Sequence, residues 1–389
     1  MRVGLVVERF SPDGGGLETW TWQLAHALEH RGHDVSVVTF RGAHCPGRAG
    51  IRVTALPWDN DRMRRAAIAE RAVAGMQLDL THDLGVCTRA SVLHPQSGSR
   101  LANEQRESLT KTRLHRLAAR LDPSRARWLR QLRLFETSRY PPPEGCLVIA
   151  VSRTVAADLA LWHGVPAERI RIVPNGIDTA RFAPPMQADR EGVRESLGVA
   201  GTAMFLFSAH NPHLKGIGPL LRAFARARSH RPNMMLVAIG KRPDARILRD
   251  VRRLGLQGSV RFDGPVSDPL PHYHAADAFV LPTWHDACSL SVLEACACGV
   301  PVITTRTNGA SELLSPGIEG HIIESAGDVD ALTGALADLA APSARARMSA
   351  HARHTALSND FARNVDGIER VYRETLERLR SRTACDRSA

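Results

Sequence analysis

The sequence is short of cysteine and has no long apolar run. Its seven cysteines are an odd number without a C-x-x-C pair, so we expect reduced thiols and neither a disulfide framework nor a structural zinc site. No run of about 18 uninterrupted apolar residues is present, which argues against a membrane-spanning helix. The first ten residues reach Glu8 and Arg9 too early for the core of a signal peptide, which indicates a cytoplasmic protein.

Aromatic residues are also scarce, at 5% of the chain, whereas apolar residues reach 43% and charged residues 23%. This balance is typical of a soluble globular protein with a sizeable core. It excludes a disordered tail protein and a collagen-like fibre. The length of 389 residues predicts two domains and leaves room for a third.

Basic residues outnumber acidic ones by 51 to 40, and the excess is uneven. Residues 101–140 hold ten Lys and Arg against four Asp and Glu. This excess of six positive charges is over half of the net charge of +11. Such a stretch is either a solvated helix face or a surface that attracts a phosphorylated saccharide, an anionic membrane or nucleic acid. An apolar series at helical spacing favours the inner face of the cytoplasmic membrane over nucleic acid, for which too few aromatics are present: Trp128, Leu129, Leu132 and Phe135.

Short β-branched runs alternate with helical patterns along both halves of the chain, which predicts parallel βαβ units. In the first half the expected strands are Val3–Val7, Val35–Thr39, Ile51–Leu56, Leu78–His82, Ser91–His94, Leu147–Val151 and Ile170–Val173. In the second half they are Ala203–Ser208, Met235–Ile239, Ser259–Phe262, Ala278–Leu281, Val300–Thr304 and Gly320–Ile323. The fold class is therefore α/β, with two domains in succession.

The boundary between the domains is predicted at the turn of Pro174–Asp178, which the Pro184-Pro185 linker follows. We expect an N-terminal domain over residues 1–177 and a C-terminal domain over residues 178–360. Residues 361–389 are predicted to form a C-terminal helix that packs back on the first domain.

A glycine-rich loop, Ser11–Glu18, follows the first expected strand and precedes a helix. Gly15 and Gly16 let the backbone approach a ligand, and the helix start offers N–H groups to a phosphate or a sugar hydroxyl. The loop is not a dinucleotide fingerprint, because Thr19 stands where the third glycine would be, and no G-K-[ST] of a P-loop follows. A plain tight turn is the alternative.

Two further segments lie where strands of the second half end. Lys215 follows the strand Ala203–Ser208, at the edge where α/β sheets bind ligands, and its charge suits a pyrophosphate. Asp286 and Glu294 flank a predicted helix start, where the N–H groups of Ser289 and Leu290 would meet phosphate oxygens. Glu294 would accept from ribose hydroxyls and Asp286 from hydroxyls of a transferred sugar. A solvated lysine and an accidental acidic pair are the alternatives.

These segments together resemble glycosyltransferase family 4, the retaining nucleotide-sugar enzymes of GT-B architecture with two Rossmann-like domains facing across a cleft. The resemblance covers almost the whole chain. It rests on Gly15–Glu18, Val173–Phe182, Leu214–Gly216, Ile239–Pro243, Arg261–Asp268, Asp286–Glu294 and Gly299–Leu314. Within the family, DACSLSVLEA and the opening glycines look like the glucosyltransferases of lipopolysaccharide core assembly.

The resemblance implies a role for each matching position. Gly15 and Gly16 would contact the diphosphate or the sugar, Lys215 would neutralise the diphosphate, and backbone around Val266 would read the base. Ser289 and Leu290 would bind phosphate, Glu294 the ribose and Asp286 the sugar ring. His94 matches a histidine that many members place beside the reacting sugar; a structural histidine is the alternative.

Two positions depart from the family pattern. Most members carry Glu where this chain has Asp286, and many carry Arg where it has His210. A histidine is only partly charged near neutral pH, so Lys215 would neutralise the diphosphate with less help, or with that of Lys241 or Arg242.

The reaction implied is transfer of a hexose, glucose as the first guess, from a UDP-sugar or related nucleotide sugar to a saccharide or glycolipid hydroxyl with retention. The nucleotide sugar is a substrate, and no cofactor, metal or nucleic acid is expected. The alternatives are a GT-B-like nucleotide-sugar epimerase or sugar phosphorylase, and a non-catalytic basic protein that binds through residues 101–140. Acceptor dependence of product formation separates a transferase from an epimerase. The non-catalytic protein would instead show salt-sensitive binding to oligonucleotides and no affinity for nucleotide sugars.

Overall fold

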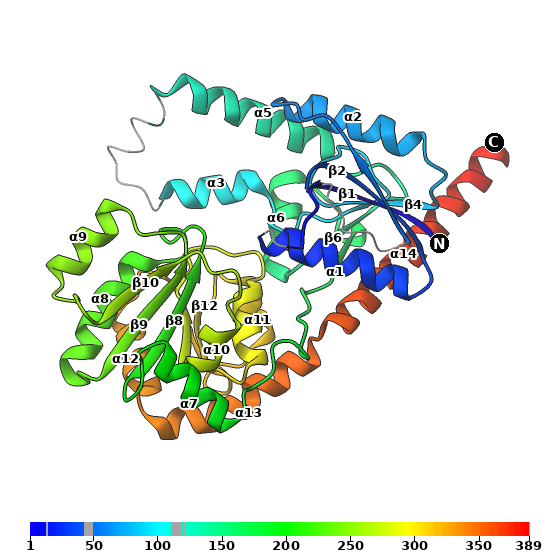
Figure 1. Ribbon diagram of the computed structural model, residues 1–389. Helices are drawn as coiled ribbons and strands as arrows, with labels where there is room; N and C mark the ends of the chain where they lie inside the picture. The colour runs from blue at the N-terminus through cyan, green and yellow to red at the C-terminus, as the bar shows by residue number, and fades with distance from the viewer. Residues whose placement is uncertain (13–14, 43–49, 110–118, 120, 389) are drawn as a thin grey trace. The chain divides into compact units, whose positions relative to one another are not determined.

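The computed structural model describes residues 1–12, 15–42, 50–109, 119 and 121–388. The chain divides into two compact units. The N-terminal unit comprises Met1–Pro174 together with Ala362–Ala389, and the C-terminal unit comprises Asn175–Phe361. Each unit is a parallel β-sheet with helices, so the predicted α/β class with two Rossmann-like domains is confirmed (Figure 1).

The N-terminal unit contains a seven-stranded parallel sheet in the order β3-β2-β1-β4-β5-β6-β7. Its strands are β1 Arg2–Arg9, β2 Asp34–Arg41, β3 Ile51–Ala55, β4 Leu80–Asp83, β5 Val92–Leu93, β6 Leu147–Ala150 and β7 Ile170–Ile172. Its helices are α1 Gly16–His30, α2 Arg62–Ala74, α3 Arg100–Leu109, α5 Pro123–Arg139, α6 Arg153–His163, the short η1 Ala167–Arg169 and, from Ala362 on, α14 Phe361–Ser388.

The C-terminal unit contains a six-stranded parallel sheet in the order β10-β9-β8-β11-β12-β13. Its strands are β8 Ala203–Ala209, β9 Met234–Gly240, β10 Val260–Gly264, β11 Ala278–Leu281, β12 Val302–Thr305 and β13 Gly320–Ile323. Its helices are α7 Gln187–Ser196, α8 Ile217–His230, α9 Ala245–Arg253, α10 Leu270–Ala275, α11 Leu290–Ala297, η2 Gly309–Leu313, α12 Val329–Leu339 and α13 Pro342–Ser358.

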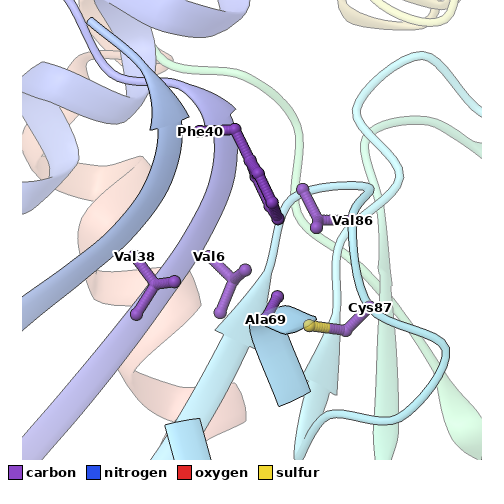
Figure 2. Packing of buried hydrophobic residues seen from close by; sticks show 6 residues of the cluster. All are labelled: Val6, Val38, Phe40, Ala69, Val86 and Cys87. Atoms are coloured by element: carbon purple, nitrogen blue, oxygen red, sulfur yellow. The ribbon is translucent and has the colours of Figure 1, made fainter. Parts of the chain in front are cut away.

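The strands form where the sequence has continuous apolar runs, because a parallel sheet covered by helices buries both of its faces. In β1, residues 3–7 are all buried, and Val3 lies between Val35 of β2 and Leu80 of β4. Figure 2 shows how α2 covers this sheet: Ala69 of α2 packs with Val6 of β1 and with Val38, Phe40, Val86 and Cys87. This cluster fixes the start of α2 at the carboxyl edge of the sheet.

The boundary between the units lies slightly before the predicted one. Residues after Pro174 belong to the C-terminal unit, because Asn175 Nδ2 donates to the carbonyl of Cys288 at 2.9 Å. Ile177 pairs with Asp360, at the end of the same unit. The chain then returns to the N-terminal unit, where Tyr372 of α14 is fully buried.

Candidate functional site

The carboxyl ends of β8 and β11 bring together two of the predicted residues. The strand order of the C-terminal unit reverses between β8 and β11, the place where open α/β sheets form a ligand-binding crevice. Lys215 follows β8 and Asp286 follows β11, and Lys215 Nζ donates to Asp286 Oδ2 in an ion pair. Their side chains are 21% and 16% exposed, so the pair is shielded but reachable from solvent.

Gly216 allows the turn that carries Lys215 to lie against the loop after β11. Its φ is +83°, and a Cβ at this position would lie 1.9 Å from the carbonyl oxygen of Pro282. The carbonyl of Leu214 also accepts from the N–H of Trp284 at 2.9 Å. The two loops are therefore held together by backbone contacts, and only glycine fits where they touch.

The start of α11 is organised by Asn308, a buried residue that was not among the predicted site residues. Its Oδ1 accepts from the N–H of Ser289 at 3.3 Å and of Ala310 at 3.1 Å, while its Nδ2 donates to Thr304 Oγ1 at 3.0 Å. The N–H of Ser289 is therefore not free, contrary to the prediction. No partner is recorded for the N–H of Leu290 among the described residues, so it can still donate to a ligand. Asn308 is also the N-cap residue of η2, and an Asn before Gly at a helix start was the sequence signal for this role.

Glu294 lies on α11 with its carboxylate held by a second residue that the sequence did not reveal. Tyr273 of α10 is fully buried, and its Oη donates to Glu294 Oε2 at 2.6 Å. Burial raises the pKa of Glu294, and the hydrogen bond from Tyr273 and the charge of Arg181 oppose that rise. The bond occupies Oε2 and leaves Oε1 to accept from a ligand.

Other predicted residues of this unit lie around the same edge of the sheet. His210 is exposed at the end of β8, and Lys241 is exposed directly after the adjacent strand β9. The Arg242 guanidinium packs over Gly264 at the end of β10, where a Cβ would lie 3.6 Å from Arg242 Cζ. Val266, two residues further on, is half-buried. Arg242 thus supplies a positive charge beside the turn predicted to read the base.

In the N-terminal unit, Gly15 and Gly16 lie at the start of α1, after β1. Gly15 is the N-cap residue, with φ −75° and ψ −176°, and Gly16 is the first residue of the helix and is exposed. This is the positive end of the helix dipole. Asp13 and Gly14 of the same loop lie outside the described residues.

His94 is fully buried at the end of β5 and forms part of a chain of three aromatic side chains. His94 Nδ1 lies 3.0 Å from His82 Nε2, and His82 Nδ1 lies 2.6 Å from the Oη of Tyr372. The two imidazoles are stacked with their centroids 5.1 Å apart, and the Trp20 ring meets His94 edge-on. His94 Nε2 is buried and has no hydrogen-bond partner among the described residues.

Both histidines are neutral at physiological pH. Burial lowers the pKa of His82 to about 3. Burial, followed by the neighbouring His82 and Arg139, holds the pKa of His94 well below its ordinary value. In neutral imidazoles each contact has one donor and one acceptor, so the protonation of one ring fixes that of the next. If Tyr372 donates to His82, then His82 donates to His94, and His94 Nε2 carries a proton.

The basic stretch 101–140 differs in part from the expectation. Leu132 and Phe135 are buried, so they belong to the core and not to an exposed apolar stripe. Arg139 is also buried, in an ion pair with Asp83. Four of the basic residues lie outside the described residues: Lys111, Arg113, Arg116 and Arg120. Among the described residues of this stretch, the large apolar side chains that are exposed are Leu121, Trp128 and Leu134. Exposed arginines accompany the latter two on α5: Arg127, Arg130 and Arg133.

Among the described residues there is neither a metal-binding cluster nor a helix that could span a membrane. No cluster of three or more His, Cys, Asp or Glu side chains is placed there to hold a metal ion. Nor does any helix in that part of the chain have the length and apolar character needed to cross a membrane. The five cysteines described with their side chains are all buried as free thiols: Cys87, Cys146, Cys288, Cys296 and Cys298.

Comparison with protein-family models gives one match in each half of the chain. The model for Glycosyltransferase Family 4 matches residues 14–181. The model for Glycosyl transferases group 1 matches residues 202–341. The first match covers the glycine loop, β5 and the inter-unit turn, and the second covers Lys215, Asp286 and Glu294.

Curated relatives share about a third of the aligned residues. A GDP-mannose-dependent alpha-(1-6)-phosphatidylinositol monomannoside mannosyltransferase of Mycolicibacterium smegmatis is 35% identical over 224 residues, which are 55% of this chain and 58% of the relative. A D-inositol 3-phosphate glycosyltransferase of Geodermatophilus obscurus is 31% identical over 245 residues, 60% of this chain and 53% of the relative. The alignments thus span little more than half of these relatives.

Among solved structures, that of WaaG, a glycosyltransferase involved in lipopolysaccharide biosynthesis, is similar with a TM-score of 0.78. The match covers 94% of this chain and 97% of WaaG at 21% sequence identity. At this identity the likeness shows the fold.

Proposed function

Because this chain belongs to the glycosyltransferases, with a family 4 domain in its first half and a group 1 domain in its second, we propose that it transfers a hexose from a nucleoside-diphosphate sugar to a hydroxyl of a saccharide or glycolipid. The observation that carries the proposal is the ion pair of Lys215 and Asp286 at the strand reversal of the C-terminal unit. It places a cation and a carboxylate where such sheets bind ligands.

The cation serves the leaving group. When the bond from the anomeric carbon to the diphosphate breaks, the carbon becomes cationic and negative charge collects on the diphosphate oxygens. The Lys215 ammonium and the N–H of Leu290 at the start of α11 supply fixed positive charge for those oxygens, and such stabilisation is usually the largest catalytic contribution. Donor binding exchanges the Lys215 contact with Asp286 for one with phosphate, which releases Asp286 for hydroxyls of the sugar.

The two carboxylates of the candidate site, Asp286 and Glu294, have partners that suit them to binding and not to nucleophilic attack. Asp286 is held by Lys215, and Glu294 is held by Tyr273. A retaining glycosidase places two carboxyl groups about 5 Å apart and uses one of them as the nucleophile. We propose instead that the departing phosphate removes the acceptor proton on the same face, so that the anomeric configuration is kept. Glu294 Oε1 accepts from the ribose.

His94 offers a neutral hydrogen-bonding group within the N-terminal unit, and we propose that it contacts a hydroxyl of the substrate. Its buried Nε2 is the end of the chain that runs from Tyr372 through His82. A hydroxyl of the substrate would give this atom the hydrogen-bond partner that the described residues do not provide. Because the imidazole stays neutral, it adds no charge that would oppose the cationic anomeric carbon.

Measurement of ligand-induced shifts in melting temperature tests the donor, since a ligand that binds only the folded state raises it. UDP-glucose, the donor favoured by the sequence resemblance, is compared with GDP-mannose, named in the mannosyltransferase relative, and with ADP-glucose. Transfer is then assayed with and without an acceptor. Product formed without an acceptor indicates an epimerase, and dependence on inorganic phosphate indicates a phosphorylase.

Two variants test the site itself. Lys215→Gln should lower kcat of transfer by about 10²-fold, as loss of one oxyanion-stabilising group does elsewhere. Glu294→Ala should abolish turnover and weaken nucleotide binding. Arg249→Gln, on an exposed position of α9, removes one positive charge away from the site and is the control. Full activity in both site variants contradicts the assignment.

We further propose that the exposed face of α5 contacts an anionic membrane, where a glycolipid acceptor would lie. Trp128 and Leu134 are 38% and 53% exposed among exposed arginines, so the solvent side of α5 carries both apolar groups and the cationic groups that anionic lipids attract. Co-sedimentation with phosphatidylglycerol vesicles, and not with phosphatidylcholine vesicles, is expected. Trp128→Ser and Arg130→Gln should each weaken binding to phosphatidylglycerol vesicles. If both variants bind these vesicles as well as Arg249→Gln does, the proposed contact is rejected.

A further inference from the structure

Four arginines gather at the carboxyl edge of the N-terminal sheet. Arg62 is the first residue of α2, and Arg65 lies one turn further along the same helix. Arg100 is the first residue of α3, and Arg139 is the last residue of α5. Arg65 and Arg139 are buried, and Arg62 and Arg100 are half-buried. The charges of these arginines act on one another across three helices. In addition to burial, Arg139 and Arg65 lower the pKa of Arg100, and Arg100 lowers the pKa of Arg62.

Two of the four guanidinium groups are engaged by protein atoms. Arg65 donates to the carbonyl of Asp59 at 2.6 Å, stacks on the ring of Trp58 and lies 3.9 Å from Glu8. Arg139 donates to Asp83, to the carbonyl of Cys87 at 2.6 Å and to the Oη of Tyr140 at 3.0 Å. These two are structural.

The other two differ. For the guanidinium groups of Arg62 and Arg100, no hydrogen bond or ion pair is recorded with any described residue. The Nη2 atom of the buried Arg139 is likewise without a partner in that part of the chain. Arg100 Nη2 lies 3.9 Å from where a Cβ of Gly85 would be, so this guanidinium reaches the loop after β4, which also holds the carbonyl of Cys87 that Arg139 contacts.

The carboxylates that face the cluster, Glu8 and Glu136, oppose the lowering of the pKa of Arg62 and Arg100 by burial, but among the described residues neither forms a hydrogen bond with these two guanidinium groups. Glu136 accepts from the N–H groups of Arg100 and Leu101 and lies 3.3 Å from His163, so its oxygens are already occupied. Glu8 is 40% exposed and is shared with Arg65. Burial, together with Arg100 and Arg65, lowers the pKa of Arg62 to about 10.

An arrangement of this kind is unfavourable for folding alone. Half-buried cations without partners pay for desolvation, and they repel one another. Arg62 and Arg100 also stand at helix N-termini, where positive charge opposes the helix dipole. An anion bound between them would reverse each of these costs.

We propose that Arg62 and Arg100 form a binding site for a phosphoryl group carried by the acceptor. The guanidinium fork pairs with two oxygens of one phosphoryl group, and two forks from different helices suit a tetrahedral dianion better than a planar carboxylate. The site lies at the carboxyl edge of a parallel sheet, where ligands bind in this fold class. That the phosphoryl group belongs to the acceptor follows only if the proposed function is right. The binding of a phosphoryl group stands on the arginines.

The test uses glycerol 3-phosphate as the probe, glycerol as its uncharged counterpart and sodium chloride at matched ionic strength. The melting temperature of the full chain is measured with each, for the wild type, Arg62→Gln and Arg100→Gln. Arg64→Gln is the matched control, because Arg64 lies on the same helix with its side chain 76% exposed. UDP and GDP are measured in the same variants.

The expected result is a rise in melting temperature with glycerol 3-phosphate only. Its apparent Kd should increase at least tenfold in Arg62→Gln and in Arg100→Gln and less than twofold in Arg64→Gln. Without probe, Arg62→Gln should melt at the same or a higher temperature than the wild type, which a structural arginine would not allow.

Two results would overturn the inference. One is a wild type that glycerol 3-phosphate stabilises no more than sodium chloride does. The other is a loss of nucleotide binding, and not of glycerol 3-phosphate binding, in the two variants, which would assign the arginines to the donor diphosphate. Nucleotide binding that persists while the probe fails leaves the proposed function intact, so the two failures are distinguishable.

Discussion

Replacing Tyr273 by Phe removes a single oxygen from beside Glu294. The ring packs against Phe182 and Phe279, with centroids 6.0 and 5.8 Å away, and a Phe would keep both contacts. What is lost is the hydrogen bond to Glu294 Oε2 at 2.6 Å. A buried hydrogen bond to a charged group contributes about 1.5–3 kcal/mol. We expect a decrease of about 2 kcal/mol in the free energy of unfolding, or roughly 4–8 °C in melting temperature for a domain of this size.

The size of this loss should depend on pH. Burial raises the pKa of Glu294 and the Tyr273 hydrogen bond lowers it, so the variant has a higher folded-state pKa. A carboxyl group whose pKa is higher folded than unfolded lowers stability once the pH exceeds its unfolded value. The variant should therefore lose more stability at pH 8, where an unsupported carboxylate is buried, than near pH 4.5, where Glu294 takes up a proton.

Urea unfolding of the C-terminal unit at both pH values measures this difference. Glu294→Gln is the control, because it keeps an acceptor for Tyr273 but cannot titrate. In the Glu294→Gln background, Tyr273→Phe should lower the free energy of unfolding by the same amount at both pH values. Nucleotide affinity should also fall in Tyr273→Phe, since Glu294 would no longer be oriented. Equal losses of stability at pH 8 and pH 4.5 in the wild-type background would refute the argument.

Gly216→Ala should lower stability by several kcal/mol and transfer activity with it, because the new Cβ would lie 1.9 Å from the Pro282 carbonyl. Gly218→Ala, in the first turn of α8, would bring a Cβ only into ordinary contact with Arg222 Nη1 at 3.9 Å and should instead stabilise by about 0.5–1 kcal/mol, and thermal unfolding distinguishes the two. Stability should also fall as the pH drops below 6.5, because the unfolded chain protonates His82 and His94 while the folded chain does not. Each histidine contributes up to about 1.4 kcal/mol per pH unit in this range, and His82→Asn should flatten the measured profile; an unchanged slope would reject the assignment of neutral histidines.

Much of the fold could be predicted, because parallel strands buried on both faces leave continuous β-branched runs in the sequence. All thirteen strands that the structure describes overlap predicted ones, with ends that differ by at most two residues. The candidate residues around Lys215 and Asp286 could be found because each follows a strand, and the carboxyl ends of parallel strands meet at one edge. The family resemblance rested on these same segments.

Partners from distant parts of the chain were not predictable. Tyr273 is 21 positions from Glu294, and no local pattern in the sequence links the two. The hydrogen-bonded series of His94, His82 and Tyr372 joins the end of β5 to α14, residues that lie far apart in the sequence. Leu132 has the spacing of an exposed apolar stripe, yet it is buried, because the same helical period describes a face turned to solvent or to the core.

The sequence by itself therefore determined the two α/β domains, their strands and the loops that carry the chemistry, since these depend on local pattern. Only the tertiary structure decided which charged groups meet. It paired Lys215 with Asp286 and used the N–H of Ser289 for Asn308. Among the described residues it gave the guanidinium groups of Arg62 and Arg100 no ion pair with a carboxylate. The reason is physical: strand and helix periods are set by neighbours along the chain, whereas the cost of a buried charge depends on whatever the fold brings within a few ångströms of it.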